Sequence, residues 1–203
     1  MSSSELVRWG GLAAMGAGAL YILAEFMDLY NFVLAGGGEQ LSDVMATAPY
    51  AVEALLLLLG DVLLLFGLFG LYVRQSEAAG TLGLVGFLVA FLGTALTVGV
   101  DWDEVFVVPI LADAAPELLD AGPPLGIILS FLTFLVGWLM FGVAALRARV
   151  YPRWAALLLI VGAVLAGVPL SLSTVPFGIA VAWMGSTLFA GRNTSAEQPA
   201  RVR

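Results

Sequence analysis

Carboxylic acids within long apolar stretches are the most unusual feature of this sequence. Seven polar side chains stand out by their depth in these stretches or by their helical spacing: Glu25, Asp28, Glu53, Asp61, Thr97, Asp101 and Glu104. A charged group at the centre of a bilayer costs about 2.5–3.5 kcal/mol on the insertion scale, so such groups face the interior of a helix bundle. We therefore predict that these side chains line a shared polar cavity.

Helical spacing arranges the acids in two polar stripes. One stripe consists of Tyr21, Glu25 and Asp28. The other consists of Thr94, Thr97, Asp101 and Glu104. Residues separated by three, four or seven positions share one face of a helix, so each stripe is expected to point in a single direction. Asp61 lies deepest, after a run of five leucines. We expect the stripes to face each other and the cavity to open toward the outside.

The acids have no basic partner at a comparable depth. The chain contains no lysine, histidine or cysteine, and all eight basic residues are arginines near the ends of the apolar runs. This composition excludes imidazole and thiolate metal ligands, histidine-assisted serine hydrolysis and Schiff-base chemistry. Buried carboxylates without a basic partner must be protonated, hydrated or bound to a cation.

Oxygen ligands of this kind suit a hard cation such as Ca²⁺, Mg²⁺, Mn²⁺ or Na⁺, and no other cofactor is expected. Glu25, Asp28 and Asp101 are the candidate metal ligands. The same side chains suit the recognition of an organic cation or the relay of protons. The alternative is that they cap helices at a wet outer interface.

The composition is that of a membrane protein. Hydrophobic residues make up 61% of the chain and charged residues 11%, and the mean hydropathy is +1.03. Ordinary soluble domains carry roughly 25% charged residues. A net charge of −7 argues against nucleic acid as a partner. The lipid bilayer is therefore the expected surrounding.

Six apolar runs are long enough to cross a bilayer, since each crossing takes about 20 residues. They cover residues 7–33, 49–73, 80–100, 124–146, 154–170 and 175–190. With both termini in the cytoplasm, all eight arginines fall on the cytoplasmic side, as the positive-inside rule expects. We predict an all-α bundle of six transmembrane helices in the cytoplasmic membrane, with acidic loops outside. Residues 1–191 form its single domain, and residues 192–203 form a disordered cytoplasmic tail.

Two weaker patterns concern packing and repetition. Gly10, Ala14 and Gly18 form a stripe of small residues on the first span, which suits close packing within the chain or docking of another membrane protein. The sequence from Arg8 also resembles the sequence from Arg153, which suggests a parallel repeat of a two-span unit. Chance similarity between apolar segments is the alternative to a repeat.

Three functions are compatible with these patterns. The first is binding or transport of a cation or small cationic solute through the acidic cavity. The second is a non-catalytic accessory or scaffold subunit of a membrane complex. The third is an intramembrane aspartyl-type enzyme that uses Asp61 and Asp101. We expect these two at different depths, because Asp61 lies about 18 Å below the outer end of its span. A non-enzymatic protein is therefore favoured.

Overall fold

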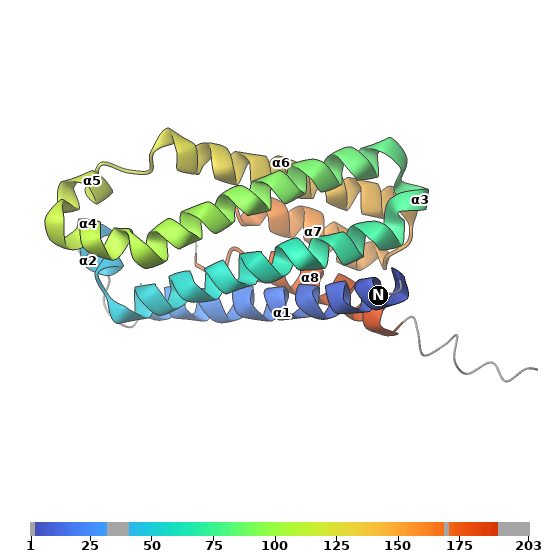
Figure 1. The fold of residues 1–203 in the computed structure, drawn as a ribbon, viewed down its shortest axis with the longest axis horizontal. Coiled ribbons are helices and arrows are strands. Elements are labelled where there is room, and N and C mark those ends of the chain that lie inside the picture. Colours follow the sequence, from blue (N-terminus) through green and yellow to red (C-terminus); the bar gives the residue numbers. More distant parts are fainter. Residues whose placement is uncertain (1–2, 32–40, 169–170, 191–203) are drawn as a thin grey trace, which may run out of the picture.

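The computed structural model describes residues 3–31, 41–168 and 171–190, and within these ranges it contains helices and no strand (Figure 1). The helices are α1 (Ser3–Leu29), α2 (Leu41–Met45), α3 (Ala48–Phe106), α4 (Val108–Ala114), α5 (Pro116–Asp120), α6 (Leu125–Ala148), α7 (Arg153–Leu165) and α8 (Val175–Ala190). The predicted all-α class is confirmed. The predicted tail, residues 192–203, lies outside the described residues.

Three helices, α1, α3 and α6, are long and apolar enough to cross a membrane. The prediction of a membrane protein is confirmed at this level. The helices α7 and α8 are apolar but shorter, with 13 and 16 residues. In the bundle, α1 packs against α3 and α8, whereas α6 packs against α3 and α7.

The 59 residues of α3 form a helical hairpin. Gly80 interrupts the helix with φ 55° and ψ −151°, a backbone conformation that side chains with a Cβ rarely adopt. The chain reverses there, so residues 48–79 and 81–106 run side by side in opposite directions (Figure 1). We call these two segments the first and second arm of α3. At the start of the first arm, the side chain of Thr47 caps the helix by accepting a hydrogen bond from the Tyr50 amide.

Close backbone contacts hold the helices together. The small residues of α1 contact glycines of α3 and α8: Gly10 meets Gly70, Ala14 meets Gly67, and Gly18 meets Gly178. The stripe predicted on the first span is therefore used for packing within the chain. Between membrane helices, such contacts replace the hydrophobic driving force that soluble proteins use.

The bundle has two unlike ends (Figure 1). The N-terminus, the Gly80 turn and the connection from α6 to α7 lie at one end, and α2, α4 and α5 lie at the other. A core of large side chains fills the half nearer the Gly80 turn, where Trp138, Phe141 and Leu68 are fully buried. The α7–α8 hairpin starts at that end and stops short of α2, α4 and α5. The opposite half of the bundle is therefore less completely filled.

Candidate functional site

Two neighbouring cavities lie where the α7–α8 hairpin ends. Residues of its turn, Ala166 and Thr174 among them, line the cavities together with side chains of α1, α3 and α6. We call the cavity lined by Asp61 and Asp101 the inner cavity, and it has a volume of about 110 Å³. The cavity lined by Glu25 and Glu53 is the outer cavity, with a volume of about 370 Å³. Leu57, Phe131 and Thr174 line both cavities, so the two are adjacent.

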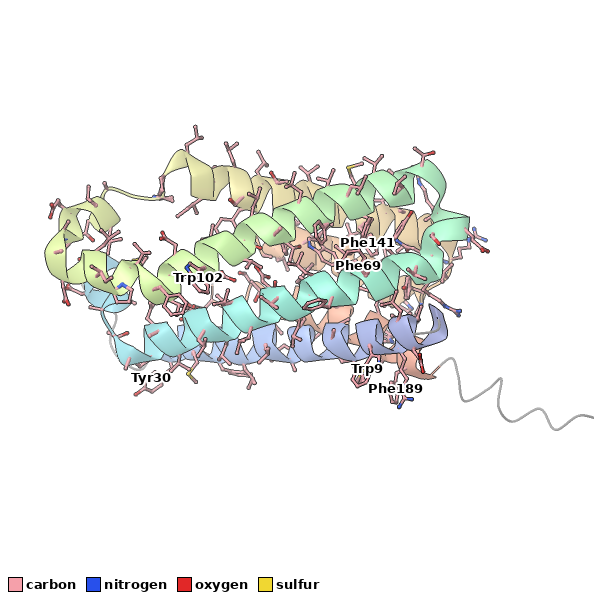
Figure 2. The ribbon with its side chains drawn as sticks, viewed as in Figure 1. Trp9, Tyr30, Phe69, Trp102, Phe141 and Phe189 are labelled. Atoms are coloured by element: carbon pink, nitrogen blue, oxygen red, sulfur yellow. The ribbon has the colours of Figure 1, made fainter. Side chains whose placement is uncertain are left out.

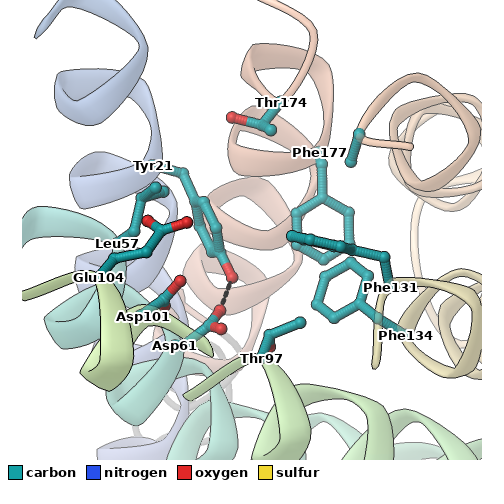
Figure 3. Close-up of a pocket in the computed structure, with 11 residues that line it drawn as sticks. Tyr21, Leu57, Asp61, Thr97, Asp101, Glu104, Phe131, Phe134, Thr174 and Phe177 are labelled. Atoms are coloured by element: carbon teal, nitrogen blue, oxygen red, sulfur yellow. Dashed lines mark hydrogen bonds between the residues drawn. The ribbon is translucent and has the colours of Figure 1, made fainter. Parts of the chain in front are cut away.

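A pair of aspartates forms the polar wall of the inner cavity (Figure 3). Asp61 is 3% exposed and Asp101 is 7% exposed, and their carboxyl groups lie within hydrogen-bonding reach of each other. Tyr21 of α1 donates a hydrogen bond from its hydroxyl to Asp61 Oδ1. Thr97, one helical turn before Asp101, lies next to Asp61 and donates its hydroxyl proton to the carbonyl of Thr94.

This contact corrects the prediction that Asp61 and Asp101 lie at different depths. The prediction took the depth of Asp61 and of Asp101 from the outer end of the span that contains each residue. The Gly80 turn sets the register instead, because it joins the two arms of α3. Asp61 precedes Gly80 by 19 residues and Asp101 follows it by 21, so antiparallel arms bring the two side chains to the same level.

Neither cavity has a cationic side chain in its lining among the described residues. Asp101 Oδ2 is buried, and no N–H or hydroxyl group of the described chain donates to it. Glu104 extends the acidic wall outward and accepts a hydrogen bond from the Tyr50 hydroxyl. Four of the seven residues expected in one cavity, Asp61, Thr97, Asp101 and Glu104, therefore line the inner cavity together.

Aromatic rings form the opposite wall of the inner cavity. Phe131 and Phe134 of α6 and Phe177 of α8 face the acidic residues across it (Figure 3). The Phe177 ring centroid lies 5.6 Å from that of Tyr21 and 5.3 Å from that of Phe134. These rings were not predicted from the sequence. The only available signal was the spacing of Phe131 and Phe134, three residues apart on one helix face.

The remaining predicted residues line the outer cavity. These are Glu25, Asp28 and Glu53. Glu25 Oε1 accepts a hydrogen bond of 2.8 Å from the Thr174 amide just before α8, and therefore caps that helix. Glu53 Oε2 accepts one of 3.0 Å from Asn31 Nδ2. Part of the acidic set thus has a structural role, as the helix-capping alternative proposed.

The predicted metal ligands are divided between the two cavities. Glu25 and Asp28 line the outer cavity and Asp101 lines the inner one. Within the described ranges, no three acidic side chains are grouped closely enough to hold a metal ion. The structure therefore does not bring the three predicted metal ligands together in one cavity.

The function of the chain must be argued from this geometry. No known protein family, curated protein or solved structure matches the chain. The described site combines two carboxyl groups in contact, facing aromatic rings and the absence of basic residues from the cavity lining. These three features limit the chemistry that the cavity can support.

Proposed function

We propose that the chain is a membrane protein that binds a cation or small cationic solute in the acidic cavities and takes part in its transport. The contact between Asp61 and Asp101, with no basic side chain in the described lining, supports this proposal most directly. A buried carboxylate is costly unless a proton or a cation compensates its charge. Both carboxyl groups line the inner cavity, so a cation that compensates their charge would have to lie within that cavity.

The proposal includes a six-span topology. The spans are α1, the two arms of α3, α6, α7 and α8. The five arginines of the described chain lie near the N-terminus, before the Gly80 turn or at the α6–α7 connection, which share one end of the bundle. By the positive-inside rule, we expect that end in the cytoplasm and the cavities toward the outside. The parallel repeat stays a prediction.

Aromatic side chains agree with this placement. Trp9 is 62% exposed at the end that carries the N-terminus, whereas Tyr30 and Trp102 are 44% and 57% exposed toward the opposite end (Figure 2). Exposed tryptophan and tyrosine favour the two interfaces of a bilayer.

The shorter helices α7 and α8 measure about 20 and 24 Å at 1.5 Å per residue, less than a bilayer core of about 30 Å. Their length explains why the outer half stays hollow.

Thermal unfolding of the purified protein in mild detergent tests the proposed binding. A panel of Na⁺, Ca²⁺, Mg²⁺, Mn²⁺ and organic ammonium salts is compared at constant ionic strength. A ligand at about 100 times its Kd adds about 2.7 kcal/mol to the free energy of unfolding, which raises the unfolding midpoint by several degrees. We expect at least one cation to stabilise the wild type and to lose this effect in Asp101→Asn.

The matched control is Asp113→Asn, which removes an exposed carboxylate on α4 outside both cavities. This variant should respond to the cation as the wild type does. An equal loss in both variants would indicate general screening of negative charge. A panel without any stabilising cation would contradict the proposal and favour the accessory-subunit alternative.

The contact between Asp61 and Asp101 also supports a second candidate, an intramembrane aspartyl-type hydrolase. Two carboxyl groups that share one proton can activate a water molecule. The inner cavity is small for a peptide segment, which makes this candidate the weaker one. Cleavage of transmembrane peptides by the purified protein, with loss of cleavage in both Asp61→Asn and Asp101→Asn, would favour it over cation binding.

A further inference from the structure

The charge balance of the inner cavity limits what can enter it. The titratable groups that face the Asp61–Asp101 pair are Tyr21 from α1 and Glu104 from α3. The lining contributed by α6 and α8 consists of phenylalanines within the described chain. A net negative charge at this depth has no compensating cationic side chain nearby. A negative charge on the pair must therefore be compensated by a proton or by a cation inside the cavity.

Asp101 has a carboxyl oxygen without a hydrogen-bond partner, as Glu25 Oε2 does at the outer cavity. Asp101 is 93% buried, yet its Oδ2 receives no hydrogen bond from an N–H or hydroxyl group of the described chain. Buried polar atoms are normally satisfied, and the exceptions need an explanation. A ligand with N–H donors in the inner cavity would satisfy this oxygen.

The aromatic wall selects the type of cation. Phe131, Phe134 and Phe177 present rings on the side of the cavity opposite the aspartates (Figure 3). Aromatic faces attract organic ammonium groups, and the attraction strengthens when water is excluded. A bare divalent metal ion instead requires six to eight oxygen ligands or several retained waters. An alkylammonium ion fits both walls, with its N–H groups toward the carboxyl groups and its carbon atoms toward the rings.

We propose that the inner cavity binds a small organic ammonium ion in exchange for one proton of the Asp61–Asp101 pair. This inference rests on the proposed cation-binding function and specifies its substrate class. The empty pair holds two protons and is neutral. On binding, one carboxyl group loses its proton to water and its carboxylate pairs with the ammonium ion, so the aspartate pair together with its ligand is again neutral. The second proton stays between the two aspartates.

Isothermal titration calorimetry with methylammonium chloride tests this exchange. The purified protein in detergent is titrated in phosphate and in MOPS buffer at the same neutral pH and ionic strength. Because the two buffers take up protons with different heats, the difference in binding heat reports the number of protons released. We expect about one proton per methylammonium ion bound, and no comparable binding of sodium chloride.

Two variants separate the contributions of the carboxyl groups and of the Phe131 ring to methylammonium binding. The double variant Asp61→Asn/Asp101→Asn has no carboxyl proton to release at this pair, so methylammonium binding should weaken strongly and proton release should disappear. Phe131→Leu keeps an apolar side chain at a position that is 45% exposed, and its fold should be preserved. Loss of one cation–π contact should weaken binding about three- to tenfold and leave the proton count unchanged.

The possible failures differ from one another. Methylammonium binding without proton release would overturn the exchange and leave cation binding in place. Binding of sodium but not methylammonium, or an unchanged affinity in Phe131→Leu, would overturn the ammonium assignment. Absence of binding by either salt would overturn the exchange, and the proposed function would fall with it only if no cation of the wider panel stabilised the protein.

Discussion

Replacement of Gly137 by valine is expected to abolish the folded bundle. A Cβ at this position would lie 2.3 Å from the backbone nitrogen of Ala90, 2.4 Å from its Cα and 2.5 Å from the carbonyl carbon of Val89. All three atoms belong to the backbone of the second arm of α3, so no side-chain rotation can relieve the overlap. The two helices would have to separate.

The expected cost exceeds the ~1–3 kcal/mol that is typical of overpacking, because the clash is with backbone atoms and extends through γ-methyl groups. Size-exclusion chromatography in mild detergent, followed by thermal unfolding, measures the loss. Gly99→Val is the matched control, since Gly99 also lies within a long helix, α3, but has no atom within 4 Å of an added Cβ. Equal stability of the two variants would contradict the close approach of α3 and α6.

Single-cysteine labelling is expected to give an all-or-none result for the topology. The wild-type chain contains no cysteine, so each introduced thiol is the only one present. Asp113 on α4 and Glu77 before the Gly80 turn are both exposed and lie at opposite ends of the bundle. In the six-span topology, a membrane-impermeant maleimide added to intact cells labels Asp113→Cys. The same reagent labels Glu77→Cys only after the membrane is disrupted.

Each other labelling pattern has a definite meaning. Labelling of Glu77→Cys but not Asp113→Cys in intact cells would place the cavities in the cytoplasm. Labelling of both positions in intact cells would show that the α3 hairpin does not cross the membrane. Complete labelling of both variants in detergent confirms that each thiol is reactive.

The sequence was sufficient to predict the helical class and most of the long helices. The predicted run at 49–73 lies within the first arm of α3, and the run that begins at Gly80 starts at the turn itself. These features depend on the local density of apolar residues, which a single sequence displays directly. The fifth run was predicted to reach residue 170, whereas α7 ends at Leu165, because the apolar composition continues beyond that residue.

The arrangement of the site was only partly predictable. Helical spacing correctly grouped Thr97, Asp101 and Glu104 on one face, because that relation lies within one helix. The depth of Asp61 relative to Asp101 depends on the register between the two arms of α3. Helical periodicity within one span does not predict that register. The aromatic wall was missed for a different reason. Phe131 and a lipid-facing phenylalanine have the same hydropathy, so the sequence does not distinguish the inner from the outer face of α6.

The contact between Asp61 and Asp101 depends on the number of residues that separate each aspartate from the Gly80 turn. One residue inserted between Asp61 and Gly80 would turn Asp61 by about 100° around its helix and shift it by about 1.5 Å along the axis. The carboxyl group would then leave the cavity, although every residue of the site was still present. Insertions or deletions between Asp61 and Gly80, or between Gly80 and Asp101, are therefore as damaging to the site as replacement of an aspartate. The outer loops, in contrast, can change in length without altering the distance between Asp61 and Asp101.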